Sequence, residues 1–309
     1  NNLKTLTKII FSVIFVKLYG QNLILDNQSP SMTGTHNYDV ISLNNGSFIN
    51  VVGDDNTLSL ICDSIFIDAN SGIIASGTSE HGWIGDGGNY ASYSGGGGGG
   101  GLANTGGAGG GLDPSVGGVS YGGPYDLRTG SKGGRGAVTD CDNYTQAYEP
   151  GGFGGGAIYI QARILVLHGS IRAEGTNGSD IFTSQGYEYY DHGGAGGGSG
   201  GTVQINSETI IFNESYSMIS VIGGNGGIPY EENDNGCSNN IAPGGGGGGA
   251  GGYITIITET DIPDYIDQIL NLNGGIGGDN PNIFCYTGFD GMPGLLTYDK
   301  IWLTSSTHP

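Results

Sequence analysis

The feature that most constrains this chain is a run of glycines leading directly into a short stretch typical of a β-strand. GGFGGG at 151–156 precedes AIYIQA, GGAGGGSGG at 193–201 precedes TVQINS, and GGGGGGAGG at 244–252 precedes YITIIT. Glycine supplies no side chain for a core, whereas the stretches that follow alternate β-branched residues with others, at the period of a half-buried strand. The repetition predicts one structural unit used several times.

Four copies of this unit can be aligned. They begin at Thr57, Ala157, Thr202 and Tyr253, so that successive copies start 100, 45 and 51 residues apart. The first two align with a two-residue insertion near Ala69–Asn70 and end in IIASGTS and IRAEGTN. Repeats of about this length build stacked arrays. The first interval is about two periods, so we expect a glycine-rich arm there in place of one strand unit.

The expected fold class is all-β, a repeat array like a β-solenoid or a β-sandwich, with almost no α-helix after the N-terminal leader. Within the glycine runs we expect polyglycine II, an extended left-handed helix with three residues per turn. Such helices can pack closely and satisfy each other's backbone groups, because no side chain keeps them apart. A flexible linker is the alternative interpretation of a single run. A short helical turn is expected only within Asp261–Leu272.

Composition and charge exclude several classes of protein. Glycine accounts for 66 of the 309 residues, but in blocks rather than at every third position with abundant proline, which excludes collagen. The 29 acidic and 9 basic residues give a net charge of -20, which disfavours nucleic acid and anionic membrane surfaces as partners.

No chemistry-bearing motif occurs in the chain. The five histidines form no close pair, and no phosphate-binding loop or nucleophile elbow is present. We therefore expect no enzyme activity, no catalytic residue and no cofactor. Asp-rich turns at 53–56 and 231–236 could hold Ca²⁺, although turn chemistry explains them equally well.

Residues 1–20 are expected to be a secretory signal peptide. Lys4 and Lys8 precede the apolar run Ile9–Val16, and the small residue Gly20 follows. A retained apolar segment that packs between subunits is the alternative. The rest divides into an N-terminal β segment (21–56), a glycine-rich β repeat domain (57–287) and a C-terminal capping strand segment (288–309). No second membrane span is expected, so none remains in the mature chain.

Other features fit a secreted protein. Four triplets match the acceptor for N-glycosylation: Asn45, Asn143, Asn177 and Asn213. An even number of cysteines predicts two disulfides. We expect Cys141 to pair with Cys237, because their polar loops occupy equivalent places, and Cys62 to pair with Cys285. The loop GYEYYDHG is a possible contact loop through three tyrosines: Tyr187, Tyr189 and Tyr190.

The joins GGGSGGTVQI and GGFGGGAIYI, with the endings IRAEGTNG and VIGGNGG, carry a family resemblance. Over about Thr57–Gly278 the chain resembles the large glycine-rich repeat proteins of protist and microbial cell surfaces. That resemblance implies an extracellular structural or adhesive role. The glycine blocks are also similar to the glycine-rich extracellular domain of anaplastic lymphoma kinase, in which polyglycine helices bundle beside β-structure. This second similarity is compositional, and no kinase motif accompanies it.

The function expected from these features is that of a structural subunit of an extracellular filament, coat or matrix. Strand edges and glycine-helix faces would join it to copies of itself. The alternative is an adhesin module that binds glycans or another surface through its tyrosine-rich loops. A polysaccharide-active β-helix enzyme is a more distant alternative.

Overall fold

The computed structural model describes residues 20–53, 56–77, 87–88, 95–111, 115–139, 145–180, 191–230, 243–279 and 286–300. Within these ranges the regular structure is almost entirely β-strand, with one four-residue helix, α1 (Ile266–Ile269). The expectation of an all-β chain is confirmed. Both large sheets are built from parallel strands.

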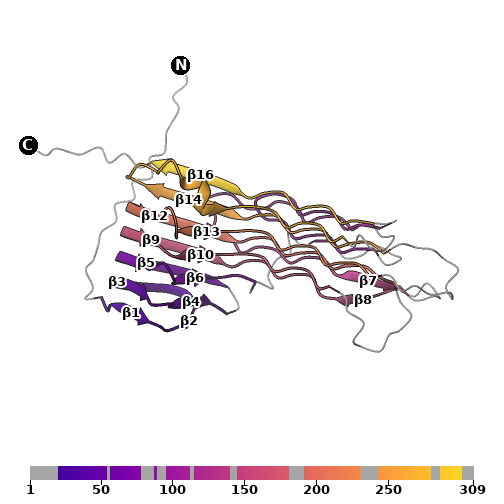
Figure 1. Cartoon of the computed structure of the whole chain (residues 1–309), viewed down its shortest axis with the longest axis horizontal. Helices are drawn as coiled ribbons and strands as arrows, with labels where there is room; N and C mark the ends of the chain where they lie inside the picture. The colour runs from indigo at the N-terminus through magenta and orange to yellow at the C-terminus, as the bar shows by residue number, and fades with distance from the viewer. Residues whose placement is uncertain are drawn as a thin grey trace, which may run out of the picture.

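The larger sheet contains seven strands that follow one another in chain order (Figure 1). They are β1 (Leu23–Asp26), β3 (Gly34–Asn44), β5 (Thr57–Ile67), β9 (Ala157–Leu167), β12 (Thr202–Phe212), β14 (Tyr253–Thr258) and β16 (Leu295–Lys300). Their register confirms the predicted alignment of copies: Thr57 lies beside Ala157, Ala157 beside Thr202, and Thr202 beside Tyr253. Leu295 continues the same row as a fifth member.

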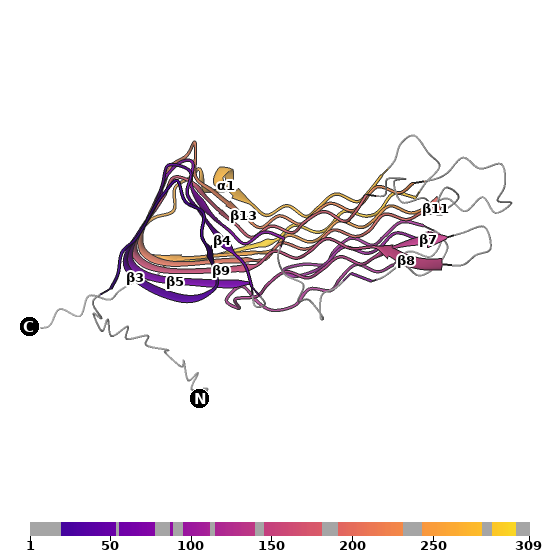
Figure 2. The ribbon, with the colours of Figure 1, turned by 90° about the horizontal axis from the view of Figure 1, so that it is seen from below.

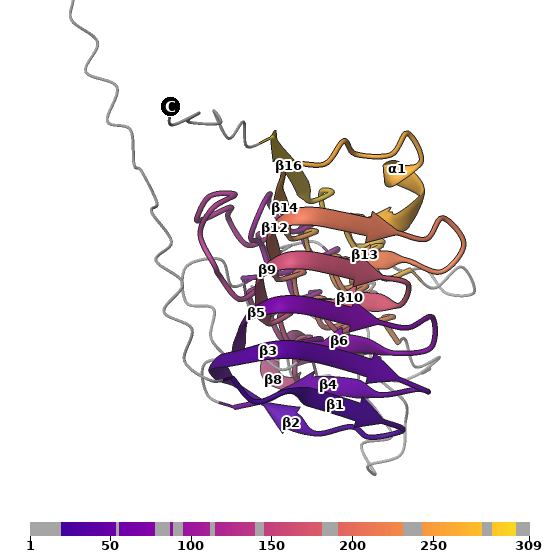
Figure 3. The ribbon, with the colours of Figure 1, turned by 90° about the vertical axis from the view of Figure 1, so that its left-hand side faces the viewer.

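The second sheet contains six short parallel strands. They are β2 (Ser31–Met32), β4 (Phe48–Val51), β6 (Gly72–Ile74), β10 (Ser170–Arg172), β13 (Met218–Ser220) and β15 (Leu270–Asn271). The chain passes from each long strand of β3 to β12 through a turn to the next short strand, so the two sheets extend side by side (Figure 3). The turn after β5 is two residues longer than the turn after β9, as the predicted insertion at Ala69–Asn70 requires.

A third, small antiparallel sheet lies away from the two large ones (Figure 1). It contains β7 (Gly136–Thr139), β8 (Thr145–Glu149) and β11 (Asp191–His192). The main core lies between the two large sheets and is built from rows of apolar side chains. In one such row Leu58, Ile158, Val203 and Ile254 are neighbours in register, and each is 0% exposed.

Beyond the sheets, the glycine segments run side by side as a bundle (Figures 1 and 2). The amides of Gly194, Gly197 and Gly200 donate to carbonyl oxygens of segment 244–252 at 2.8–2.9 Å. The amides that follow each of these donate to segment 173–179, and the amides of Gly196 and Ser199 donate to segment 131–134. The direction of hydrogen bonding therefore repeats every three residues, which is the period of an extended three-residue helix.

Segment 244–252 follows the same rule. Its amides from 245 to 252 donate in turn to segments 286–292, 221–227 and 97–100, and every one of them has a carbonyl acceptor. Glycine is required here because the neighbouring backbones approach so closely. A Cβ atom built on Gly197 would overlap the carbonyl oxygen of Gly224, and one on Gly247 would overlap that of Gly107.

Two segments on the outside of the bundle, 222–228 and 273–279, carry a larger residue at every third position, and Asn225 and Ile276 at these positions are exposed. The Asn177 Oδ1 atom accepts a hydrogen bond from the amide of Asn225, and Asn225 Oδ1 accepts one from the amide of Ile276, both at 2.9 Å. We call the two exposed residues Asn177 and Asn225 the asparagine ladder. Their carboxamides replace the carbonyls that an additional segment would supply.

Candidate assembly surfaces

The surface beyond β16, here called the β16 end, exposes residues that would be core residues elsewhere in the stack. No described strand pairs with the outer edge of β16. Leu296 and Tyr298 lie in register with Ile254 and Ile256, on the core-facing side of the sheet. Leu296 is 41% and Tyr298 39% exposed, whereas both isoleucines are 0% exposed. The rows of apolar core residues are therefore left partly uncovered at this surface.

The glycine segment 286–294 borders the same end. Gly288, Gly291 and Gly294 donate to carbonyls of segment 272–278 at 2.6–2.9 Å. Between them, Phe289 and Met292 are 65% and 54% exposed. Apolar side chains and an open strand edge thus occur together at one end of the molecule.

The opposite surface, here called the β1 end, has a different composition. β1 pairs only with Ile41–Asn44, the second half of β3. Along the first half, Gly34–Tyr38, β5 is the only strand partner among the described residues. The rings of His36 and Tyr38 are stacked there, with centroids 6.3 Å apart. The molecule therefore has two unlike ends, and each offers a strand edge.

Residues 121–129, here called the strap, fold back over the outer face of the larger sheet. The Thr202 hydroxyl donates to the carbonyl of Arg128 at 2.7 Å, and the Thr255 hydroxyl donates to that of Pro124. The Tyr125 hydroxyl donates to Asp299, and this hydrogen bond raises the pKa of the tyrosine. These contacts attach the strap to β12, β14 and β16.

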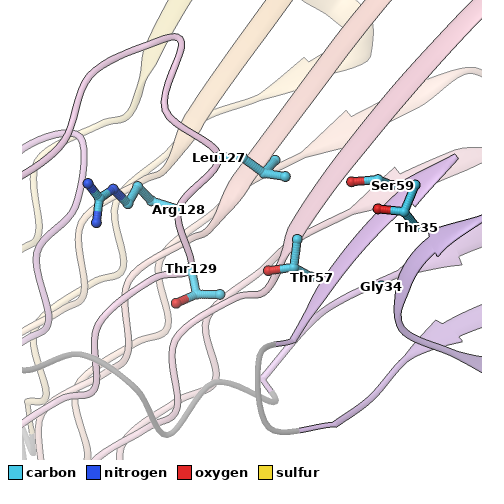
Figure 4. Close-up of a pocket in the computed structure, with 7 residues that line it drawn as sticks. All are labelled: Gly34, Thr35, Thr57, Ser59, Leu127, Arg128 and Thr129. Carbon is cyan, nitrogen blue, oxygen red and sulfur yellow. The ribbon is translucent and has the colours of Figure 1, made fainter. Parts of the chain in front are cut away.

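A cavity of about 470 Å³ lies where the strap meets β3 and β5 (Figure 4). It is lined by Gly34, Thr35, Thr57, Ser59, Leu127, Arg128 and Thr129. The guanidinium group of Arg128 extends away from Thr57 and Ser59, so hydroxyl groups and one leucine face the space between strap and sheet. This lining contains no carboxylate, histidine or cysteine, so the lining itself supplies no base to activate its hydroxyl groups.

One ion pair fixes the chain beside the β16 end. Lys300 Nζ contacts Asp261, which raises the pKa of the lysine and lowers that of the aspartate through their hydrogen bond and charges. Asp261 is 90% exposed, so the pair adds little stability. It joins the last described residue of β16 to the segment that follows β14.

Three of the four glycosylation candidates lie among the described residues. Asn45 is exposed in a turn, and its Nδ2 atom donates to Asp26 at 2.6 Å. Asn177 is exposed and belongs to the asparagine ladder. Asn213 is half-buried, and its Oδ1 atom accepts from the amide of Ser215. All four, with Asn143 outside the described residues, stay predictions.

The expected disulfide between Cys62 and Cys285 is not formed, because Cys62 is a free cysteine. Its side chain is 3% exposed on the core-facing side of β5, and burial raises the pKa of the thiol to about 12. Tyr286, the neighbour of Cys285, is bridged to Gly244. Gly244 begins a nine-residue segment that spans ~28 Å at ~3.1 Å per residue before it reaches the sheet. Tyr286 therefore lies at the end of that segment that is away from the sheet containing Cys62.

Several other predicted residues fall outside the described ranges. They are the pair Cys141 and Cys237, the contact residues Tyr187, Tyr189 and Tyr190, the aspartates of turn 53–56, the whole of turn 231–236 and the leader residues 1–19. In the part of the chain that is described, no three metal-ligating side chains gather into a group. No helix there is long and apolar enough to cross a membrane.

The sequence predicts that strand edges join the chain to copies of itself, but the residues at the two ends are not among the predicted site residues. A signal for the β16 end is present in the sequence. Leu295 and Leu296 are adjacent, so they face opposite sides of one strand, and both are more than 40% exposed. In the preceding YTGFDGMPG, glycine occurs only at every third position, as expected of a segment with few glycine neighbours.

Comparison of the chain with protein-family models, with curated proteins and with solved structures found no match.

Proposed function

We propose that this protein is a structural subunit of an extracellular filament, coat or matrix, and that it assembles with copies of itself through strand edges. The observation that carries the proposal is the pair of unlike open ends on one parallel sheet. A parallel sheet can be continued by another molecule in the same orientation, and a contact between two different surfaces of one chain propagates without closing.

We further infer that the strand region is a β-solenoid and that each glycine run is a polyglycine II helix. The chain returns repeatedly through the same two parallel sheets, as a solenoid does, and the glycine amides bond in three directions with a period of three residues. In this arrangement the bundle stiffens the stack from one side. Glycine loses more conformational entropy on ordering than any other residue. A glycine run can therefore have a mechanical role only if it belongs to a cooperative bundle whose hydrogen bonds offset this loss.

Negative-stain electron microscopy of the purified chain tests the proposal, with Leu296→Asp as the disrupting variant. A charge at the open core row should abolish filaments, because it would be buried between two copies. Phe66→Asp is the matched control, since Phe66 is 40% exposed on β5 and lies in register between Ser42 of β3 and Val166 of β9 rather than on an end strand. Discrete particles for the wild type under all conditions tested would rule out self-assembly as the function.

A glycan-binding adhesin is the second candidate. It is favoured by the cavity under the strap, whose threonine and serine hydroxyls can exchange hydrogen bonds with sugar hydroxyls. Binding to a glycan array that is lost in Thr57→Val and kept in Thr209→Val would support it. Thr209 lies on β12, outside the cavity lining. A wild-type protein that binds no glycan would remove this candidate.

A further inference from the structure

We propose that two copies join by interlocking steps, so that β16 of one copy pairs with Gly34–Tyr38 of a second copy. The proposal rests on the self-assembly proposed above and adds the contact surface and its register. It follows from the observation that the two halves of the long strands end at different levels of the stack, and that the half that extends further differs between the two ends.

At the β16 end, the first halves of the long strands continue further along the stack than their second halves. β14 and β16 pair with each other over six residues, and β14 pairs with Thr202–Ser207, the first half of β12. The second half of β12 is covered by a loop instead. The Glu259 amide donates to the carbonyl of Glu208 at 3.2 Å, and the Tyr265 hydroxyl donates to that of Phe212 at the same distance. In the second half β12 is therefore the last strand, two strands below β16, and the loop occupies one of those two levels.

At the β1 end, the second halves of the long strands continue further along the stack than their first halves. β1 pairs with Ile41–Asn44. Of these residues, Ile41–Leu43 align with Ile65–Ile67 of β5, whose partners are Leu165–Leu167 of β9. The first half of β3, Gly34–Tyr38, aligns with Leu58–Cys62 and has no further described strand beyond it. The projecting half at each end thus corresponds to the recessed half at the other (Figure 3).

When the β16 end of one copy meets the β1 end of a second copy in the same orientation, the two molecules together form one complete turn of the stack. β16 supplies its first half, and β1 of the second copy supplies its second half. In this register Leu296 lies beside Gly34 of the second copy, where there is no side chain to clash. Tyr298 lies beside His36 of the second copy, which is already stacked on an aromatic ring. The open core rows of the β16 end would then be covered.

The interlocked register makes a specific prediction for the filament repeat. Each copy contributes six strand levels, because β1 shares the level of β16 of the preceding copy. At the usual spacing of ~4.8 Å between strands, the axial rise per subunit is ~29 Å. Simple stacking of β1 on β16 would instead use seven levels, with a rise of ~34 Å. Helical reconstruction from cryo-electron micrographs measures this rise directly.

Cysteine cross-linking tests the register at residue level. Thr297 aligns through Thr255, Gln204, Tyr159 and Ser59 with Thr35, so the step places Thr297 beside Thr35 of the next copy. The double variant Thr35→Cys/Thr297→Cys should form a ladder of covalent multimers on oxidation. Thr35→Cys/Asp299→Cys is the matched control, because it is two residues out of register, which is beyond the reach of a disulfide between parallel strands.

The outcomes separate this inference from the proposed function. A rise of ~29 Å with the Thr35–Thr297 ladder supports the interlocked register. Filaments with a rise of ~34 Å, or covalent dimers from Thr297→Cys alone, would overturn it and leave self-assembly standing. Absence of filaments would overturn both.

Discussion

The amide of Gly197 donates to the carbonyl oxygen of Gly247 at 2.9 Å, and the amide of Gly247 donates to that of Gly97 at 2.8 Å. Three stretches of chain that are far apart in sequence are thereby joined through backbone atoms alone. The contact is close because none of the three residues has a side chain.

Gly197→Val and Gly247→Val should each destabilise the protein by about 3 kcal/mol or more, because the new side chain would overlap a backbone carbonyl and force neighbouring segments apart. Thermal or denaturant unfolding measures the loss. Gly123→Val is the control, since a Cβ there meets only the Asp126 carboxylate at 3.9 Å. Wild-type stability in both bundle variants would mean that the runs behave as linkers.

Asn225→Ala should expose the amide of Ile276 to faster hydrogen exchange, because the Asn225 carboxamide is its hydrogen-bond acceptor. The expected loss of stability is only about 0.5–1 kcal/mol, since water can replace the lost acceptor at this exposed site. Asn273→Ala serves as the control, because Asn273 is exposed on the segment that contains Ile276 and is not part of the asparagine ladder. Equal exchange at Ile276 in both variants would show that the ladder does not protect this amide.

His192 should make the protein less stable as the pH falls below neutrality. Burial lowers the pKa of its imidazole, and the Nδ1 atom has no hydrogen-bond partner among the described residues. The unfolded chain therefore binds a proton at a higher pH than the folded chain. Stability is unaffected by this group above the unfolded pKa of about 6.5 and decreases as the pH falls toward the folded value.

The measurement is the melting temperature at pH 7 and pH 5, for wild type and His192→Gln. The glutamine variant should lose less stability on acidification, because it cannot take up the proton. An identical decrease in both proteins would assign the pH dependence to other groups.

The Cys62 thiol should not react with a water-soluble disulfide reagent at pH 8 while the protein is folded. Its pKa of about 12 leaves almost no thiolate, and the side chain is buried in the core. The thiol should react after unfolding, with Cys62→Ala as the reference for the number of reactive groups. Rapid labelling of Cys62 in the folded state would contradict its position in the core.

Local patterns were sufficient to predict the strands and their alignment. The glycine-to-strand joins marked Ala157, Thr202 and Tyr253 as equivalent starting points, and the register confirms this. The same alternation could have prevented the error at Cys62. In TLSLIC, Leu58, Leu60 and Cys62 fall on one face of the strand, and that face is the core.

The neighbours of each glycine segment could not be predicted. Glycine has no side chain that distinguishes one partner from another, so the contacts of segment 95–101 depend on where the flanking strands hold it. The strap was also missed, because the contacts from Thr202 and Thr255 are to its carbonyl oxygens, which any sequence provides. The exposure of Leu296 and Tyr298 results from their place in β16, which no further described strand covers.

Hydrogen exchange of the amides from 245 to 252 tests most directly whether the glycine runs are ordered structural elements. Each of these amides has a carbonyl acceptor in a neighbouring segment. They should therefore exchange as slowly as the amides of β12 and β14, through opening of the whole stack. Exchange at the rate of an unstructured peptide would contradict the bundle and reduce the glycine runs to linkers.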